Sequence, residues 1–283
     1  MKIFTRKTLL ACAVTASLAA SSGAMAQVFP DFTVNEGAIS GTTPGAPNVT
    51  ADKITGNYVE VITFSGTSFD VSLRWNAGQF VANNGNTPVA SQLGASTSNQ
   101  YGLYGLYTGR GTFTTTGPNT TVFNFTPGGT LQLFADPSSN TTFGQPGSGS
   151  TAWTTANNSD DVLLATGRPT SGQGTLDPTL PTCGATNGIN CGNFGASSSF
   201  NLTADGVRYF INPVPFYNAS FQSGQLNNFA LNNTQVINGS LDLILAGGGG
   251  GEGGPVPVPE PATVAMIGLG LLGLGLLRRR KHG

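Results

Sequence analysis

Between residues 58 and 245, short runs of Val, Ile, Leu, Thr and aromatic residues alternate with turns rich in Gly, Pro, Asn and Ser. Runs of this length and composition are typical of β-strands, and their succession predicts an all-β domain. Helix is disfavoured because Gly occupies 41 of the 283 positions. The expected strands are 58–64, 69–75, 101–107, 111–115, 121–125, 130–135, 161–165, 198–203, 207–211 and 240–245.

The region 27–245 is long enough for one β domain with its own hydrophobic core. We expect a single β-sandwich or jelly-roll-like domain there. Two stretches, 137–150 and 167–197, are rich in Gly, Ser, Pro, Thr and Asn and poor in apolar residues. They predict long loops.

The first 26 residues follow a different pattern. Three basic residues within the first seven precede an apolar run, which ends in small residues that include Ala24 and Ala26. This order is typical of a secretory signal peptide, a cleaved N-terminal signal helix, and it predicts cleavage by signal peptidase before Gln27. The alternative, a short N-terminal membrane anchor, needs a longer apolar run.

The segment 259–283 combines three parts in order. Its apolar stretch of 16 residues, 262–277, would span about 24 Å as a helix, slightly less than a hydrocarbon core of about 30 Å. Such a short transmembrane helix suits an anchor that is removed. Basic residues beyond it would stay cytoplasmic and leave the preceding chain outside. The flanking residues are Pro259, Glu260 and Pro261 before the stretch, and Arg278, Arg279 and Arg280 after it.

This tail resembles a PEP-CTERM sorting signal, with Val-Pro-Glu-Pro at 258–261 ahead of the apolar span and the Arg cluster. The resemblance implies processing by a membrane-embedded exosortase in a Gram-negative bacterium that makes exopolysaccharide. It implies a transient inner-membrane intermediate and a mature form at the cell surface or in the extracellular matrix. An ordinary tail anchor is the alternative. Residues 246–258, dominated by Gly and Pro, predict a linker.

Three further stretches, 51–64, 101–107 and 212–218, are similar to those of flocculation-associated PEP-CTERM proteins. That resemblance implies a role in floc or biofilm formation, in which the protein associates cells with exopolysaccharide. It carries over no catalytic residue. The alternative function is a dedicated carbohydrate-binding module, with or without assistance from calcium.

Charge and composition limit which partners and which enzymatic activities this protein could have. The region 27–258 contains 12 carboxylates and 5 basic side chains, a formal net charge of −7, which argues against nucleic acid as a partner. The one histidine, His282, lies beyond the apolar stretch, so this region lacks the usual general base and the commonest zinc ligand. We therefore expect no enzymatic activity and no resident cofactor; a carboxylate-based glycoside-active enzyme is the least favoured alternative.

The densest acidic point is Asp160-Asp161. Neighbours on a strand point to opposite faces, so the two carboxylates could not flank one sugar unless the backbone bends. A solvated turn is one interpretation. A weak calcium site completed by carbonyls of nearby Asn residues is another. The oxygen-rich loop from Asp136 to Asn140 has the same two interpretations.

Two other groups of residues are candidates for binding or bridging. Alternation places Tyr101 and Tyr107 on one face of their strand and Tyr104 on the other. Exposed tyrosines could stack on sugars, whereas packing in the core explains the same pattern. Cys183 and Cys191, with seven residues between them in an exported chain, predict a disulfide that closes a Gly/Asn loop.

Overall fold

The computed structural model describes residues 29–42, 46–94, 101–117, 120–177, 179, 192–223 and 233–246. All of them belong to one compact unit, Phe29–Val256. This unit is all-β, as predicted, because strands make up most of the described residues. The helical elements found there are a 3-10 turn, η1 (Glu36–Ala38), and a short helix, α2 (Ala204–Tyr209). Within these ranges, no helix has the length and apolar character needed to cross a bilayer.

The strands fall into three sheets: β14-β1-β2, the hairpin β8-β9, and one 12-stranded sheet that holds the rest. Their bounds are β1 (Phe32–Val34), β2 (Val49–Ala51), β3 (Lys53–Ser65), β4 (Ser68–Ala82), β5 (Thr87–Pro88), β6 (Gly102–Thr115), β7 (Thr121–Asp136), β8 (Thr142–Gly144), β9 (Thr154–Ala156), β10 (Val162–Gly167), β11 (Pro169–Leu176), β12 (Gly192–Ser198), β13 (Asn201–Leu202), β14 (Phe210–Asn212), β15 (Asn218–Ser223), β16 (Thr234–Ser240) and β17 (Asp242–Ala246).

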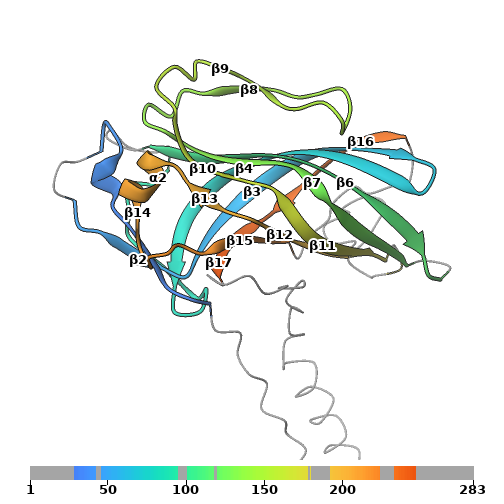
Figure 1. Ribbon diagram of the computed structural model, residues 1–283, viewed down its shortest axis with the longest axis horizontal. Coiled ribbons are helices and arrows are strands. Elements are labelled where there is room, and N and C mark those ends of the chain that lie inside the picture. Colours follow the sequence, from blue (N-terminus) through green and yellow to red (C-terminus); the bar gives the residue numbers. More distant parts are fainter. Residues whose placement is uncertain are drawn as a thin grey trace, which may run out of the picture. The chain divides into compact units, whose positions relative to one another are not determined.

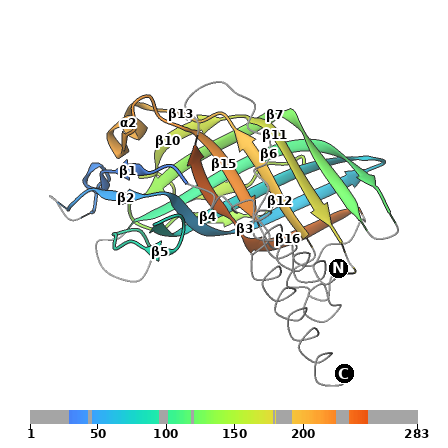
Figure 2. The ribbon, with the colours of Figure 1, turned by 90° about the horizontal axis from the view of Figure 1, so that it is seen from below.

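The large sheet closes on itself. The order β11-β12-β15-β17-β3-β4-β6-β7 is completed by antiparallel pairing of β7 with β11, and the long strands lie side by side in Figures 1 and 2. The prediction of a β-sandwich or jelly roll was therefore wrong, because it expects two sheets packed face to face, whereas here one large sheet closes on itself. The physical reason is the length of β7, whose free edge pairs with β10 at 131–135 and with β11 at 121–125.

Several predicted strands form one longer strand with their neighbour, or have different bounds in the structure. Strands 101–107 and 111–115 are one strand, β6, and 121–125 and 130–135 are one strand, β7. The predicted loop 167–197 was wrong over β11 and β12, where small residues let strands approach closely. For example, a Cβ on Gly192 would lie 1.9 Å from the Thr175 carbonyl oxygen. The predicted strand 207–211 begins within α2 instead, because the Thr203 side chain caps this helix by accepting a hydrogen bond from Gly206 N.

The second predicted loop, 137–150, belongs to an excursion from the end of β7 to the start of β10. It carries β8 and β9 and lies over the outer face of the sheet (Figure 1). The guanidinium of Arg74, on β4, lies 4.7 Å from the Phe143 ring centroid and 5.2 Å from that of Trp153. The Trp153 indole N–H donates to the Ser72 carbonyl oxygen at 3.2 Å. The excursion is thus a packed layer.

The interior of the closed sheet is filled mainly by aromatic and aliphatic side chains. Edge-to-face ring pairs link different strands, as in Tyr58 with Phe194 at 5.7 Å and Trp75 with Phe221 at 6.4 Å between centroids. Closed sheets of about eight strands have an interior just wide enough for side chains or for one small ligand. Side chains take up most of this one.

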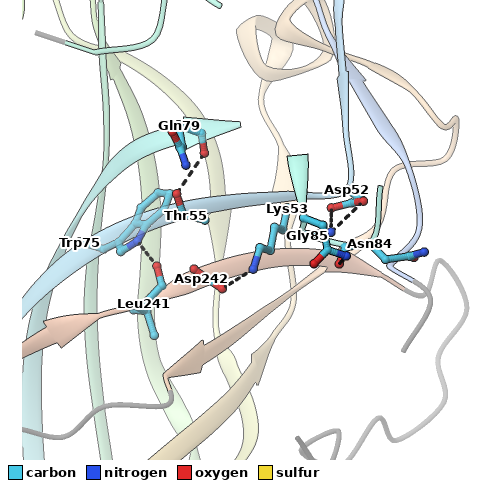
Figure 3. Close-up of polar contacts among 10 residues, drawn as sticks. Asp52, Lys53, Thr55, Trp75, Gln79, Asn84, Gly85, Leu241 and Asp242 are labelled. Atoms are coloured by element: carbon cyan, nitrogen blue, oxygen red, sulfur yellow. Dashed lines mark hydrogen bonds and ion pairs between the residues drawn. The ribbon is translucent and has the colours of Figure 1, made fainter. Parts of the chain in front are cut away.

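The seam between β3 and β17 completes the closure and is shown in Figure 3. One register pair, Ile54 with Leu243, joins the two strands. Beside it, the Trp75 indole N–H donates to the Leu241 carbonyl oxygen at 2.8 Å, and Lys53 pairs with Asp242 at 2.8 Å. Gly56 makes room for the indole, because a Cβ there would lie 2.3 Å from Trp75 Nε1.

Candidate functional site

Three carboxylates from the two predicted oxygen-rich loops come together at one end of the excursion. Asp136 ends β7, and Asp160 and Asp161 directly precede β10. One oxygen of each lies within 4.8 Å of the others. The sequence separates the two loops, but pairing of Val162 with Ala135 brings their ends side by side.

The backbone bends at this point, so the two adjacent aspartates do not diverge as they would on a strand. Asp161 N donates to the Asn158 carbonyl oxygen at 3.4 Å, which closes a turn. Asp160 accepts from Ser138 Oγ at 2.6 Å, and Asp161 accepts from Thr141 Oγ1 at 2.9 Å and from the Tyr104 hydroxyl.

These hydrogen bonds tie both ends of the excursion together. Asp136 is buried and accepts from the backbone N–H groups of Asn140 and Thr141, at 3.2 and 2.9 Å. The cluster therefore has a structural role as a loop closure, which includes the turn that the sequence predicted at Asp160-Asp161.

The electrostatics of the cluster also suit a cation. Burial raises the pKa of Asp161, and the charges of Asp136 and Asp160 raise it further, while hydrogen bonds from Tyr104 and Thr141 lower it. A divalent cation would relieve this repulsion, and carboxylate, hydroxyl and carbonyl oxygens are the ligands that calcium prefers. Asp136, Asp160 and Asp161 are the residues that could hold it.

The three candidate tyrosines are all buried. Their exposed fractions are 0% for Tyr101, 3% for Tyr104 and 7% for Tyr107. The Tyr104 ring stacks on Phe134 at 5.0 Å and meets Phe143 edge-on at 4.9 Å on the outer face, under the excursion. Tyr107 faces the interior, so the predicted alternation of faces is correct. Their burial agrees with the core-packing interpretation and leaves no exposed ring on which a sugar could stack.

Tyr101 belongs to a buried network that sequence reasoning missed. Its hydroxyl donates to the Glu36 carboxylate at 3.1 Å and lies 2.5 Å from the Tyr209 hydroxyl. Glu36 also accepts from Gln92 N at 2.9 Å. Burial raises the pKa of Glu36, while these hydrogen bonds lower it. The network links η1, α2 and the start of β6.

A further buried carboxyl belongs to Glu60, on β3. It is 7% exposed and lines two cavities inside the closed sheet. Burial raises its pKa to about 8. A sequence signal existed, because Glu60 is an acid in the apolar run 58–64 and has the same parity as Tyr58 and Ile62, which are buried.

The outer face carries a row of uncharged polar side chains that was also missed. These residues are neighbours across five consecutive strands, β3, β4, β6, β7 and β11, and each is exposed. From strand to strand in register, the row carries three hydroxyl groups and then two amide groups, about 4.8 Å apart. The row is Ser65, Ser68, Thr112, Asn124 and Gln173.

Some predicted residues fall outside the described part of the chain. They are the processing residues Ala24, Ala26, Gln27, Pro259, Glu260, Pro261 and Arg278–Arg280, and the predicted disulfide partners Cys183 and Cys191. The disulfide, the signal helix and the C-terminal helix therefore stay predictions.

The described fold defines the body as an all-β protein with a closed sheet. Comparison with protein families matches residues 257–281 to the PEP-CTERM protein-sorting motif. The chain thus carries a PEP-CTERM sorting motif, as its tail predicted, and the match begins two residues before Pro259. This motif marks an exported, surface-directed protein that is targeted to an exosortase and anchored in the membrane before it is cut. Neither the curated proteins nor the solved structures contain a match to the chain.

Proposed function

We propose that this protein acts in floc or biofilm formation by associating cells with exopolysaccharide at the surface of a Gram-negative bacterium. Signal peptidase removes 1–26, and exosortase then processes the tail after an inner-membrane intermediate. The sorting motif at 257–281 carries the proposal, because it directs the body to the surface where such polymers lie. The lack of histidine in region 27–258 supports a role that is not enzymatic.

The row from Ser65 to Gln173 supports the polymer as partner. Its hydroxyl and amide groups both donate and accept hydrogen bonds, as the hydroxyl groups of a polysaccharide do. They carry no charge, so their desolvation costs less than that of ionic groups. Many weak contacts along one polymer, repeated over many copies of the protein, would give retention by multivalency.

A complementation experiment tests the proposal. In a strain that lacks this protein, we expect the full chain to restore floc formation and polymer retention. A chain without 257–283 should fail, because it is not sorted. The triple variant Thr112→Ala, Asn124→Ala, Gln173→Ala should reach the surface but retain several-fold less polymer. Retention is measured as cell-associated polysaccharide.

The matched control is Thr166→Ala with Asn201→Ala, which removes an exposed, paired Thr and Asn from β10 and β13. This control should behave as the full chain does. Normal flocs in the deletion strain would contradict the matrix role. Equal retention by the triple variant and the control would remove the row from the proposal.

A second candidate function is glycan binding assisted by calcium at Asp136, Asp160 and Asp161. The observation that favours it is the approach of the three carboxylates to within 4.8 Å. Sugars bound through calcium use their hydroxyl oxygens as ligands to the ion, in place of the waters that commonly complete its oxygen shell.

Calcium is therefore expected to raise the unfolding temperature of the full chain. At about 100 times the dissociation constant the stabilisation is about 2.7 kcal/mol. Asp160→Asn should abolish the shift, because it removes a charge of the cluster but keeps the shape of the side chain. Calorimetry with and without a chelator measures it. An equal shift in Asp160→Asn, or no shift in either protein, would rule the site out.

A further inference from the structure

Two cavities adjoin inside the closed sheet. Both are lined by Glu60, Val71, Phe125 and Phe194. The first continues toward the Trp75 indole, and the second toward Phe69, Phe123 and Ile62. The walls therefore come from strands on opposite sides of the sheet, and most of their atoms are apolar.

Glu60 is one of two polar groups lining this interior that have no partner among the described residues. The described residues offer its carboxyl no hydrogen-bond or ion-pair partner, and burial is the cause of its raised pKa. The Tyr107 hydroxyl, in the wall of the first cavity, is also buried without a partner among them. An unsatisfied buried polar group costs about 1–3 kcal/mol. Such a cost is commonly offset by a ligand or by ordered water.

The space suits one small molecule. The cavity volumes are about 20 Å³ for the first and about 30 Å³ for the second. Since about 10–15 Å³ suffices for one water, the two adjoining cavities together have room for about three to five waters.

The chemistry of the walls selects among occupants. Buried water needs two to four polar partners; Glu60 and Tyr107 can hold one water in the first cavity, and its other lining side chains are apolar or, like Trp75, already hydrogen-bonded. A cation would require Glu60 to ionise in an apolar interior, which costs several kcal/mol for each ion. A molecule with an apolar body and one neutral polar group satisfies both the rings and the carboxyl.

We propose that the interior of the closed sheet binds a small, uncharged aromatic molecule that carries one hydroxyl group, with the hydroxyl hydrogen-bonded to Glu60. The aromatic body lies against Phe125, Phe194 and Trp75. With a pKa of about 8, the carboxyl is protonated at neutral pH and can both donate and accept. The titratable group that faces it from the other strands is Tyr107, on β6. This inference is independent of the sorting motif and of the polymer.

Phenol and toluene are matched probes, because a hydroxyl in one replaces a methyl in the other. The full chain, in detergent at pH 6.5, is titrated with each while the indole N–H signals are followed by NMR. The Trp75 signal should shift and that of Trp153, on the outer face, should not. Phenol should bind about tenfold more tightly than toluene, the value of one hydrogen bond of about 1.4 kcal/mol.

Two variants of Glu60 distinguish the contribution of its hydrogen bond from that of the fit of the aromatic ring in the cavity. Glu60→Gln keeps a neutral donor and acceptor and should preserve the preference for phenol. Glu60→Leu should abolish it while toluene still binds. Partition into detergent differs between phenol and toluene but is the same for all three proteins, so affinities are calculated from free probe concentrations and the preferences are compared between proteins. No response of Trp75, equal affinities in the unmodified chain, or an unchanged preference in Glu60→Leu would overturn the proposal.

Discussion

Replacing Trp75 with Ala is expected to lower the free energy of unfolding by about 3–5 kcal/mol, the usual cost of such a truncation in a core. Trp75 is fully buried, packs over Gly56 and holds the Leu241 carbonyl oxygen at 2.8 Å. The change removes aromatic contacts and also a hydrogen bond across the seam that joins β3 to β17. Since domains are stable by about 5–15 kcal/mol, this loss is a large share of the total.

Urea unfolding, followed by circular dichroism, measures the effect. Trp75→Phe keeps most of the ring contact and removes the N–H donor, so a smaller loss of about 1–3 kcal/mol is expected from the unpaired carbonyl. Trp153→Phe is the comparison on the outer face, where the Trp153 indole donates to Ser72 at 3.2 Å. If Trp75→Ala is no more destabilising than Trp153→Phe, the seam is not a principal source of stability.

Raising the pH from 5 to 9 is expected to destabilise the protein through Glu60. Its folded pKa of about 8 lies above the ordinary value of 4.5, so the folded state holds a proton that the unfolded state has lost. The stabilisation is fully present below pH 4.5 and falls by about 1.4 kcal/mol for each pH unit until the folded group ionises. Above about pH 8 no further loss arises from this residue.

Glu60→Gln removes the titration and should flatten this part of the profile. Burial also raises the pKa values of Glu36, Asp52 and Asp161, and these groups contribute slopes of the same sign. The informative quantity is therefore the difference between the unmodified chain and Glu60→Gln, measured by urea unfolding at each pH. Parallel profiles for the two proteins would show that the Glu60 carboxyl is not desolvated.

Local sequence patterns predicted those strands in which apolar side chains mark the buried face. The alternation in 101–107 placed Tyr101 and Tyr107 on one side and Tyr104 on the other, as observed. The apolar runs that gave β3 and β4 were equally clear. By contrast, β11 and β12 consist largely of Gly, Ser, Thr and Asn, and their small residues serve close packing of strands rather than burial of apolar area.

The sites depend on contacts that local patterns do not carry. Asp136 and Asp161 meet because β10 pairs with residues 131–135 at the end of β7, and no pattern near either residue predicts that pairing. Glu60 is unpaired because the sheet closes around it, which requires β7 to find β11. The sequence contains the residue types that a cation site and a core need. The distances between these residues depend on which strands pair, and local sequence patterns do not show that.

The first long strand of the closed sheet, β3, and the last, β17, are neighbours at Ile54 and Leu243. During synthesis and export, this seam cannot form until almost the whole body has emerged. Contacts so distant in sequence slow folding, and until then β3 and β15 each keep an open edge, which invites pairing with other chains. While this seam is open, we expect the exported body to aggregate more readily than the closed domain does.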